Sequence, residues 1–357
     1  NKTLGGFKWS LWEGAHAYKI GDYYYLMIIG SYGSWFRREV CYRSKKLYDS
    51  KASDWEAQLI FEGSTYEYGT GIAQGGIVDT IYGDWYGFLF QDHDGLGRVP
   101  SILAVNWDYV DTKNNKYYPD WPMMGYYDDK GNFVNCLGTS QKVKNPLTIQ
   151  LNKSDKESYI VGDDDFSYPD FKEGDSLKKV WQWNHNPDNS RWSLKERKGH
   201  MRLKASYAES LKTARNTLTQ RVQGPSSEAT VELDVSGLKD GNVAGFGVFE
   251  FPYAYVAVEQ TNGEKKIVMC NDGQTIETID RFEGNKIWIR ARVMDVGFRA
   301  VFYYSTDGKY FLPIGNELSM GLGLVWTANR FALFNFSKEK AGEDGYTDFN
   351  WFRFTNK

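Results

Sequence analysis

The sequence predicts an all-β protein with two domains. Short apolar and aromatic runs alternate with Gly, Asp and Asn turns along most of the chain, a pattern typical of antiparallel strands. Residues 17–20 and 23–29 flank a Gly-Asp turn, as do residues 77–80 and 85–90, and both arrangements predict β-hairpins. At 357 residues the chain exceeds the usual length of one domain, so we expect two.

The two expected domains comprise residues 1–150 and 160–357. A polar, Asp-rich connection around residues 142–168 lies between them. Beyond it, residues 229–234 and 286–292 alternate apolar and polar side chains, as half-buried antiparallel strands do. This pattern favours a β-sandwich for the second domain. Residues 204–218 have a helix-like composition, but we expect a loop within the sandwich there.

Composition excludes several classes of partner. The net charge is −3, and the 43 basic and 46 acidic residues are interspersed, so we expect no nucleic-acid partner. No run of eighteen apolar residues exists, which indicates no membrane-spanning helix. The three widely spaced cysteines, Cys41, Cys136 and Cys270, predict buried free thiols rather than disulfides or a zinc site.

Aromatic residues make up 17% of the sequence. Most are expected to fill β-cores. A flat ring with a polar edge also suits amphipathic ligands such as sugars, so a few could face a ligand.

The segment WEGAHAYK at residues 12–19, followed by an aromatic strand at 23–26, resembles the Glu-Gly-Pro-His segment of glycoside hydrolase family 43. This family of five-bladed β-propellers includes β-xylosidases and α-L-arabinofuranosidases. The resemblance implies that residues 1–150 are the C-terminal blades of such a propeller and that Glu13 is the general acid. Ala15 replaces the usual Pro but leaves the carboxylate in place. Trp12 is expected to contact substrate.

Residues 74–80, 83–86 and 96–98, with Trp107 and Trp121, resemble the last blade of the same propeller. The resemblance implies that Arg98 reaches the substrate. Gln74 stands near a His that, in many members, helps order a central metal or water. An amide can bind a water or a sugar but is a poor metal ligand, so we predict a substrate contact at Gln74 and no metal there.

Residues 165–167, 181–189, 192–194 and 347–352 resemble the concanavalin-like, jelly-roll-like sandwich of family β-xylosidases. In those enzymes an aromatic side chain of the sandwich closes the active-site pocket. The resemblance places that side chain at Trp326, just before the strand-like residues 330–334.

An inverting glycosidase needs a protonated carboxyl and an ionised carboxylate about 6.5–9.5 Å apart. The neighbours Trp9, Trp12 and Tyr18 would lower the polarity around Glu13 and favour its protonated form. The alternative is that Glu13 is an ordinary surface carboxylate. In the family the base and a second Asp precede the acid, and this chain begins twelve residues before Glu13. We therefore expect either a companion chain that carries the first blades or a fragment.

Two further clusters carry alternatives. His93 lies between Asp92 and Asp94 and is predicted either to contact substrate or to form hydrogen bonds within its loop. The acidic run ending at Asp165, together with Asp348, could bind a structural Ca²⁺, although such runs are more often solvated turns. No cofactor is expected to be required.

The favoured function is an inverting, exo-acting glycosidase that releases xylose or arabinose from β-xylosides or α-L-arabinofuranosides of hemicellulose. Its partner would be an oligosaccharide or polysaccharide. One alternative is a non-catalytic carbohydrate-binding fragment, and another is a glycosidase acting on arabinan or galactan. Polymer degradation suggests an extracellular or periplasmic location.

Overall fold

The computed structural model describes residues 2–4, 7–9, 11–32, 36–64, 71–137, 159–168, 170, 172, 176–294, 298–321 and 326–356. These residues form strands and five short 3₁₀ helices, and none of them is in an α-helix. The all-β prediction is confirmed. The chain divides into two compact units, one of residues 1–93 and 98–155 and the other of residues 94–97 and 156–357. Most of the predicted connection, namely residues 142–158, lies outside the described residues.

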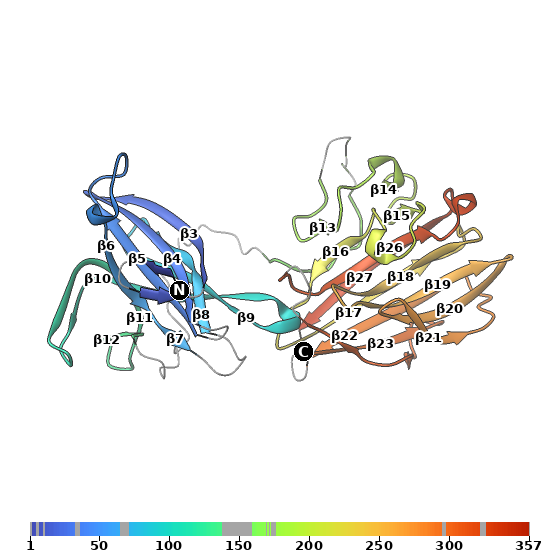
Figure 1. Cartoon of the computed structure of the whole chain (residues 1–357). Coiled ribbons are helices and arrows are strands. Elements are labelled where there is room, and N and C mark those ends of the chain that lie inside the picture. The colour runs from blue at the N-terminus through green and yellow to red at the C-terminus, as the bar shows by residue number, and fades with distance from the viewer. Residues whose placement is uncertain are drawn as a thin grey trace. The chain divides into compact units, whose positions relative to one another are not determined.

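The first unit contains three antiparallel sheets (Figure 1). A two-stranded sheet pairs β1 (Lys2–Leu4) with β2 (Phe7–Trp9). A four-stranded meander has the order β3 (Leu11–Ile20), β4 (Tyr23–Tyr32), β5 (Phe36–Ser44), β6 (Glu56–Phe61), with η1 at Ala52–Asp54. A six-stranded sheet has the order β12 (Phe133–Asn135), β11 (Lys116–Tyr127), β10 (Arg98–Asp111), β9 (Trp85–Asp92), β8 (Gly71–Asp79), β7 (Gly63–Ser64). Up-and-down sheets of this kind are the units of β-propellers, whose presence and blade number here stay a prediction.

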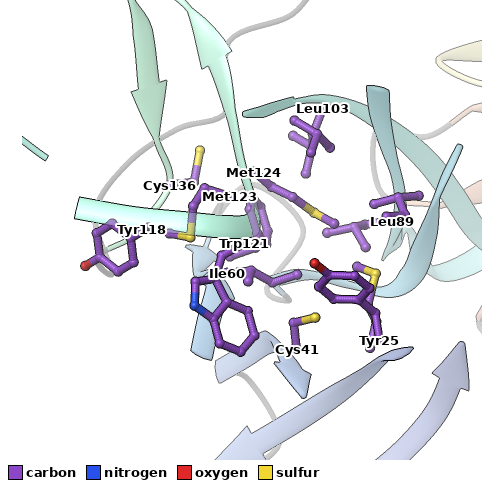
Figure 2. Packing of buried hydrophobic residues seen from close by; sticks show 14 of the residues in the cluster. Tyr25, Cys41, Ile60, Leu89, Leu103, Tyr118, Trp121, Met123, Met124 and Cys136 are labelled. Atoms are coloured by element: carbon purple, nitrogen blue, oxygen red, sulfur yellow. The ribbon is translucent and has the colours of Figure 1, made fainter. Parts of the chain in front are cut away.

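The core of the first unit lies between the four-stranded and six-stranded sheets. Met27, Cys41 and Ile60 come from the first of these sheets, Leu103 and Met123 come from the second, and all five are fully buried. Figure 2 shows Cys41, Ile60, Leu103 and Met123 within this cluster. All three cysteines are buried free thiols, as predicted.

The second unit is a sandwich of two antiparallel sheets (Figure 1). The seven-stranded sheet has the order β13 (Gln182–Trp183), β16 (Leu218–Arg221), β26 (Arg330–Ser337), β18 (Asn242–Phe249), β19 (Ala254–Thr261), β20 (Glu264–Asn271), β21 (Gln274–Ile279). The eight-stranded sheet has the order β14 (Trp192–Ser193), β15 (Met201–Lys204), β27 (Tyr346–Asn356), β17 (Ser226–Asp234), β22 (Lys286–Met294), β23 (Arg299–Ser305), β24 (Leu312–Pro313), with β25 (Leu318–Ser319) also paired to β23. The remaining 3₁₀ helices are η2 (Asp94–Leu96), η3 (Asn189–Arg191), η4 (Leu211–Thr213) and η5 (Lys340–Gly342).

Phenylalanine rings join the two sheets of the sandwich. Phe246 of β18 stacks on Phe331 of β26, with ring centroids 5.8 Å apart, and meets Phe352 of β27 edge to face at 6.1 Å. The predicted sandwich is present. The region predicted as a loop runs from the end of β15 to the start of β16 and contains η4 and an isolated bridge between Tyr207 and Ser337.

One strand differs from the predicted half-buried pattern. β22 alternates as expected, but β17 is buried along nearly its whole length, including Glu228 and Glu232. The polar face of β17 is covered by its neighbours, since Arg292 pairs with Glu228 at 2.7 Å and Lys286 with Glu232 at 3.0 Å. Long basic side chains bury their stems while neutralising the carboxylates beneath them.

A buried carboxylate anchors the start of the sandwich. The Asp164 side chain is fully buried and accepts hydrogen bonds from the Trp181 indole and the Tyr168 hydroxyl, both at 2.8 Å, and from the Phe166 amide at 3.0 Å. The ammonium group of Lys178 lies 2.9 Å from its Oδ1. The Asp164 backbone also pairs with Phe352 of β27, so this segment is tied to the central strands.

Residues 94–97 fall within the second unit although the sequence analysis assigned them to the first. The Asn329 backbone N–H and side-chain Nδ2 both donate to the Gly95 carbonyl, at 2.9 and 3.0 Å. Gly97 has a φ of +73°, and a Cβ there would lie 2.5 Å from the Ala328 nitrogen, which explains the glycine. These are interactions of the sandwich itself.

Candidate active site

Glu13 lies on β3 and is exposed in this chain. It pairs with Ile29 of β4, and Ile29 pairs with Glu39 of β5. Directly paired residues project from the same face of a sheet, so Glu13 and Glu39 share one row, two strands apart. Immediately after Glu13 the register shifts, which marks a β-bulge.

Gly14 brings the backbone beside Glu13 against Gln74 of β8. Gly14 has a φ of +65°, and a Cβ at this position would lie 2.4 Å from the Gln74 side-chain nitrogen. Gln74 also has a positive φ, of 64°, and lies in a second bulge, between Ala73 and Gly75. The two predicted site residues Glu13 and Gln74 are therefore neighbours, held there by two irregular strands.

Glu39 is a buried carboxyl group that sequence reasoning missed. Its side chain is fully buried, and Oε2 accepts a hydrogen bond from the backbone N–H of Gln74 at 2.9 Å. Oε1 is buried with no hydrogen-bond partner among the described residues. Burial raises the pKa of Glu39 to about 8, while the Gln74 hydrogen bond acts in the opposite direction. In the sequence Glu39 stands between two arginines and the apolar residues 40–42, so no local pattern marked it as buried.

Glu39 fits the role of a positioning residue rather than a base. A carboxyl with a pKa of about 8 is mostly protonated at neutral pH and cannot accept a proton there. The hydrogen bond that it accepts from the backbone N–H of Gln74 instead fixes the left-handed backbone conformation of Gln74.

This carboxyl predicts a pH-dependent stability. The pKa of Glu39 is raised from 4.5 in the folded chain. The folded chain therefore keeps a proton on Glu39 that the unfolded chain releases above about pH 4.5. The free energy of unfolding should therefore fall as pH rises from about 4.5 towards 8, by about 2–3 kcal/mol between pH 5 and 7. In Glu39→Gln this part of the slope should be absent. Urea unfolding of both proteins from pH 5 to 8 tests it, and parallel profiles would show that Glu39 is not protonated.

Arg98 is held by a second set of contacts. Its Nε lies 3.4 Å from Oδ1 of the buried Asp92, and its guanidinium lies 4.4 Å from the centre of the Phe90 ring. Asp92 also forms a close ion pair with Arg37 of β5. His93, half-buried, bonds through Nε2 to the Gln91 side chain at 3.1 Å, which fits the loop hydrogen bonding proposed for it.

Strand β5 connects the two sets of contacts. Arg37 and Glu39 are two residues apart, so they project from the same face and reach Asp92 of β9 and Gln74 of β8. The structure thus gathers Glu13, Gln74 and Arg98 around β5.

The two predicted aromatic contacts lie in different units. Trp12 is half-buried and packs against Tyr42, with ring centroids 6.3 Å apart. Trp326 belongs to the second unit, is 56% exposed, and has a φ of +52°. Its closure of a substrate pocket stays a prediction.

The calcium prediction does not fit Asp348. Arg202 reaches both carboxylate oxygens of Asp348, at 2.7 and 2.8 Å, and Arg197 lies 3.1 Å from Oδ2. Asp165 is exposed and accepts a bond from the Ser167 amide. In the described part of the chain, no three His, Cys, Asp or Glu residues gather as a metal site. A calcium ion at Asp165 stays a prediction.

No helix among the described residues is long and apolar enough to cross a membrane. The six predicted site residues lie on strands or loops of the two β-units, and their roles in catalysis or substrate binding are proposals.

The sandwich defines the class of the protein. A sequence profile of the beta-xylosidase C-terminal concanavalin A-like domain matches residues 169–355, more than half of the chain. The chain therefore belongs to glycoside hydrolase family 43.

Individual relatives agree with this assignment. A putative beta-xylosidase of Xylanibacter ruminicola is 31% identical over 319 residues, which are 87% of this chain and 52% of that protein. A non-reducing end alpha-L-arabinofuranosidase of Bacteroides ovatus is 26% identical over 57% of this chain and 35% of its own length. The solved structure of a bifunctional GH43-CE protein of Bacteroides eggerthii superposes with a TM-score of 0.76 at 33% identity, covering 97% of this chain and 41% of that one. The chain spans about half the length of the Xylanibacter relative.

Proposed function

We propose that this chain supplies the general acid and part of the sugar-binding wall of an inverting, exo-acting glycosidase that releases xylose or arabinose from hemicellulose. The observation that carries the proposal is the placement of Glu13 beside Gln74, with Arg98 reached from the same strand β5. Membership of family 43 and the names of the relatives support a glycosidase.

Each residue has a distinct task in this proposal. Glu13 protonates the oxygen of the departing group as the glycosidic bond breaks. Arg98, fixed by Asp92 and Phe90, presents a guanidinium to sugar hydroxyls. Gln74, with its backbone fixed by Glu39, offers an amide to a hydroxyl or a water.

The catalytic base is proposed to lie in polypeptide that precedes the acid in the family's order. It would come from a companion chain, as predicted from the sequence, or from further sequence of the same protein. Because hemicellulose is a polymer, we also propose that the enzyme acts outside the cell or in the periplasm. Detection of the protein in those cell fractions would test the location.

The test is hydrolysis of aryl β-xyloside and aryl α-L-arabinofuranoside by residues 1–357, alone and together with a polypeptide that carries the first propeller blades. We expect turnover only in the mixture, and NMR of the first product should show an inverted anomeric centre. Sugar binding without turnover in the mixture would instead favour the non-catalytic carbohydrate-binding alternative.

A further inference from the structure

We propose that the sandwich carries a sugar-binding pocket of its own, in which Glu250 and Arg330 bind the hydroxyl groups of a neutral sugar ring placed beside Trp183 and Phe251. This pocket is separate from the residues proposed for catalysis. The choice of a sugar as ligand rests on the proposed function.

The pocket lies at one end of the seven-stranded sheet, where β13, β16, β26 and β18 run side by side (Figure 1). Arg330 begins β26 and pairs with Phe249, the last residue of β18. On the other side, β16 pairs Thr219 with Gln182 of β13. The cavity measures about 280 Å³, close to the lower limit of about 300 Å³ for small-molecule sites, so it suits about one or two sugar rings.

Glu250 gives the pocket a buried acceptor that lacks a partner. Glu250 is only 6% exposed, and its Oε2 accepts a hydrogen bond from the Thr327 hydroxyl at 2.8 Å. Oε1 is buried and makes no hydrogen bond to any described residue. An acceptor buried without a donor costs free energy, and a hydroxyl group of a ligand would satisfy it.

The charge state of Glu250 reflects two opposing effects. Burial raises the pKa of Glu250, whereas hydrogen bonds from Thr327 and the Phe251 amide and the charge of Arg330 oppose the rise. In either protonation state the free oxygen can bond a hydroxyl, as an acceptor or as a donor.

Arg330 provides hydrogen-bond donors in the same cavity. Its guanidinium makes one long hydrogen bond among the described residues, 3.5 Å from Nη1 to the Thr219 hydroxyl oxygen. That hydroxyl already donates to the Gln182 carbonyl at 2.9 Å. The guanidinium therefore keeps donors for a ligand. A carboxyl and a guanidinium that line one cavity suit the neighbouring hydroxyls of a sugar, which both donate and accept.

Two half-buried aromatic rings line the same cavity. Trp183 is braced by Trp192, with ring centroids 5.4 Å apart, and Phe251 lies under the ammonium of Lys212 at 5.0 Å. A sugar ring has an apolar C–H face that packs on such rings while its hydroxyls point to the polar groups. The carboxylate of an acidic sugar would lie beside Glu250 as well as beside the cations Lys212 and Arg330, whereas a neutral ring meets Glu250 without charge repulsion.

The experiment measures binding of xylobiose to residues 1–357 by calorimetry. We expect Glu250→Gln and Arg330→Gln each to weaken binding by about tenfold or more, since a charge-assisted hydrogen bond is lost. Glu259→Gln is the control, because this carboxylate lies on the same sheet, pairs with Lys338 and is absent from the pocket lining.

Equal affinity in the wild type, Glu250→Gln and Arg330→Gln would overturn the proposal. Glucuronic acid binding more tightly than xylobiose would overturn the assignment to a neutral sugar. Circular dichroism identifies a variant that fails to fold, in which case the other variant decides. Turnover is not needed, so a failed glycosidase assay with retained binding would sink the proposed function and leave this pocket standing.

Discussion

Replacing Glu13 with Gln is expected to lower kcat by about 100- to 10,000-fold in the preparation that hydrolyses aryl glycosides, the range that general acid–base groups contribute. The amide keeps the size of the side chain but cannot transfer a proton. The loss should be largest for substrates with poor leaving groups such as methoxyphenol and much smaller for dinitrophenol, which departs without protonation.

Glu56→Gln is the matched control for this experiment. Glu56 is another exposed carboxylate of the same four-stranded sheet and pairs with Arg43, away from Gln74. The Glu56→Gln protein should hydrolyse both substrates at the wild-type rate. If Glu13→Gln retained wild-type rates with the poor leaving group, Glu13 would not be the acid.

The second large effect concerns stability. Asp164→Ala should lower the free energy of unfolding of the sandwich by about 3–5 kcal/mol, the cost of breaking a buried charged network by removing one partner. The change leaves the Trp181 indole, the Tyr168 hydroxyl and the Lys178 ammonium without their shared acceptor.

Urea unfolding followed by tryptophan fluorescence measures this loss. Asp165→Ala is the control, since this neighbour is exposed and should change stability by no more than about 0.5 kcal/mol. Equal losses in the two variants would mean that the Asp164 network adds nothing beyond an ordinary turn.

The fold class could be predicted because hairpin turns and alternating strands are local patterns. The surroundings of the candidate active site could not be predicted from such patterns. Glu39 and Gln74 are 35 residues apart, and both lie at irregularities of strand pairing: the register shifts between Glu39 and Val40, where β5 pairs with β6, and between Ala73 and Gly75 in β8. No local pattern carries such a register shift.

The calcium expectation shows the same limit. The acidic character of Asp348 is evident in the sequence, but its function depends on the residue opposite. The register of β15 and β27 pairs it directly with Arg202, which neutralises it. Strand pairing decided whether that carboxylate was free for a metal.

The position of residues 94–97 has a practical meaning for recombination between relatives. The sandwich cannot be exchanged as a cassette by one cut in the chain, because Asn329 takes its acceptor, Gly95, from a hairpin tip more than 200 residues earlier. A graft of residues 156–357 alone would leave the Asn329 backbone N–H without its acceptor and its Nδ2 with only the Gly321 carbonyl. A successful exchange must transfer both residues 94–97 and residues 156–357, so two separate segments of the sequence must come from the same relative.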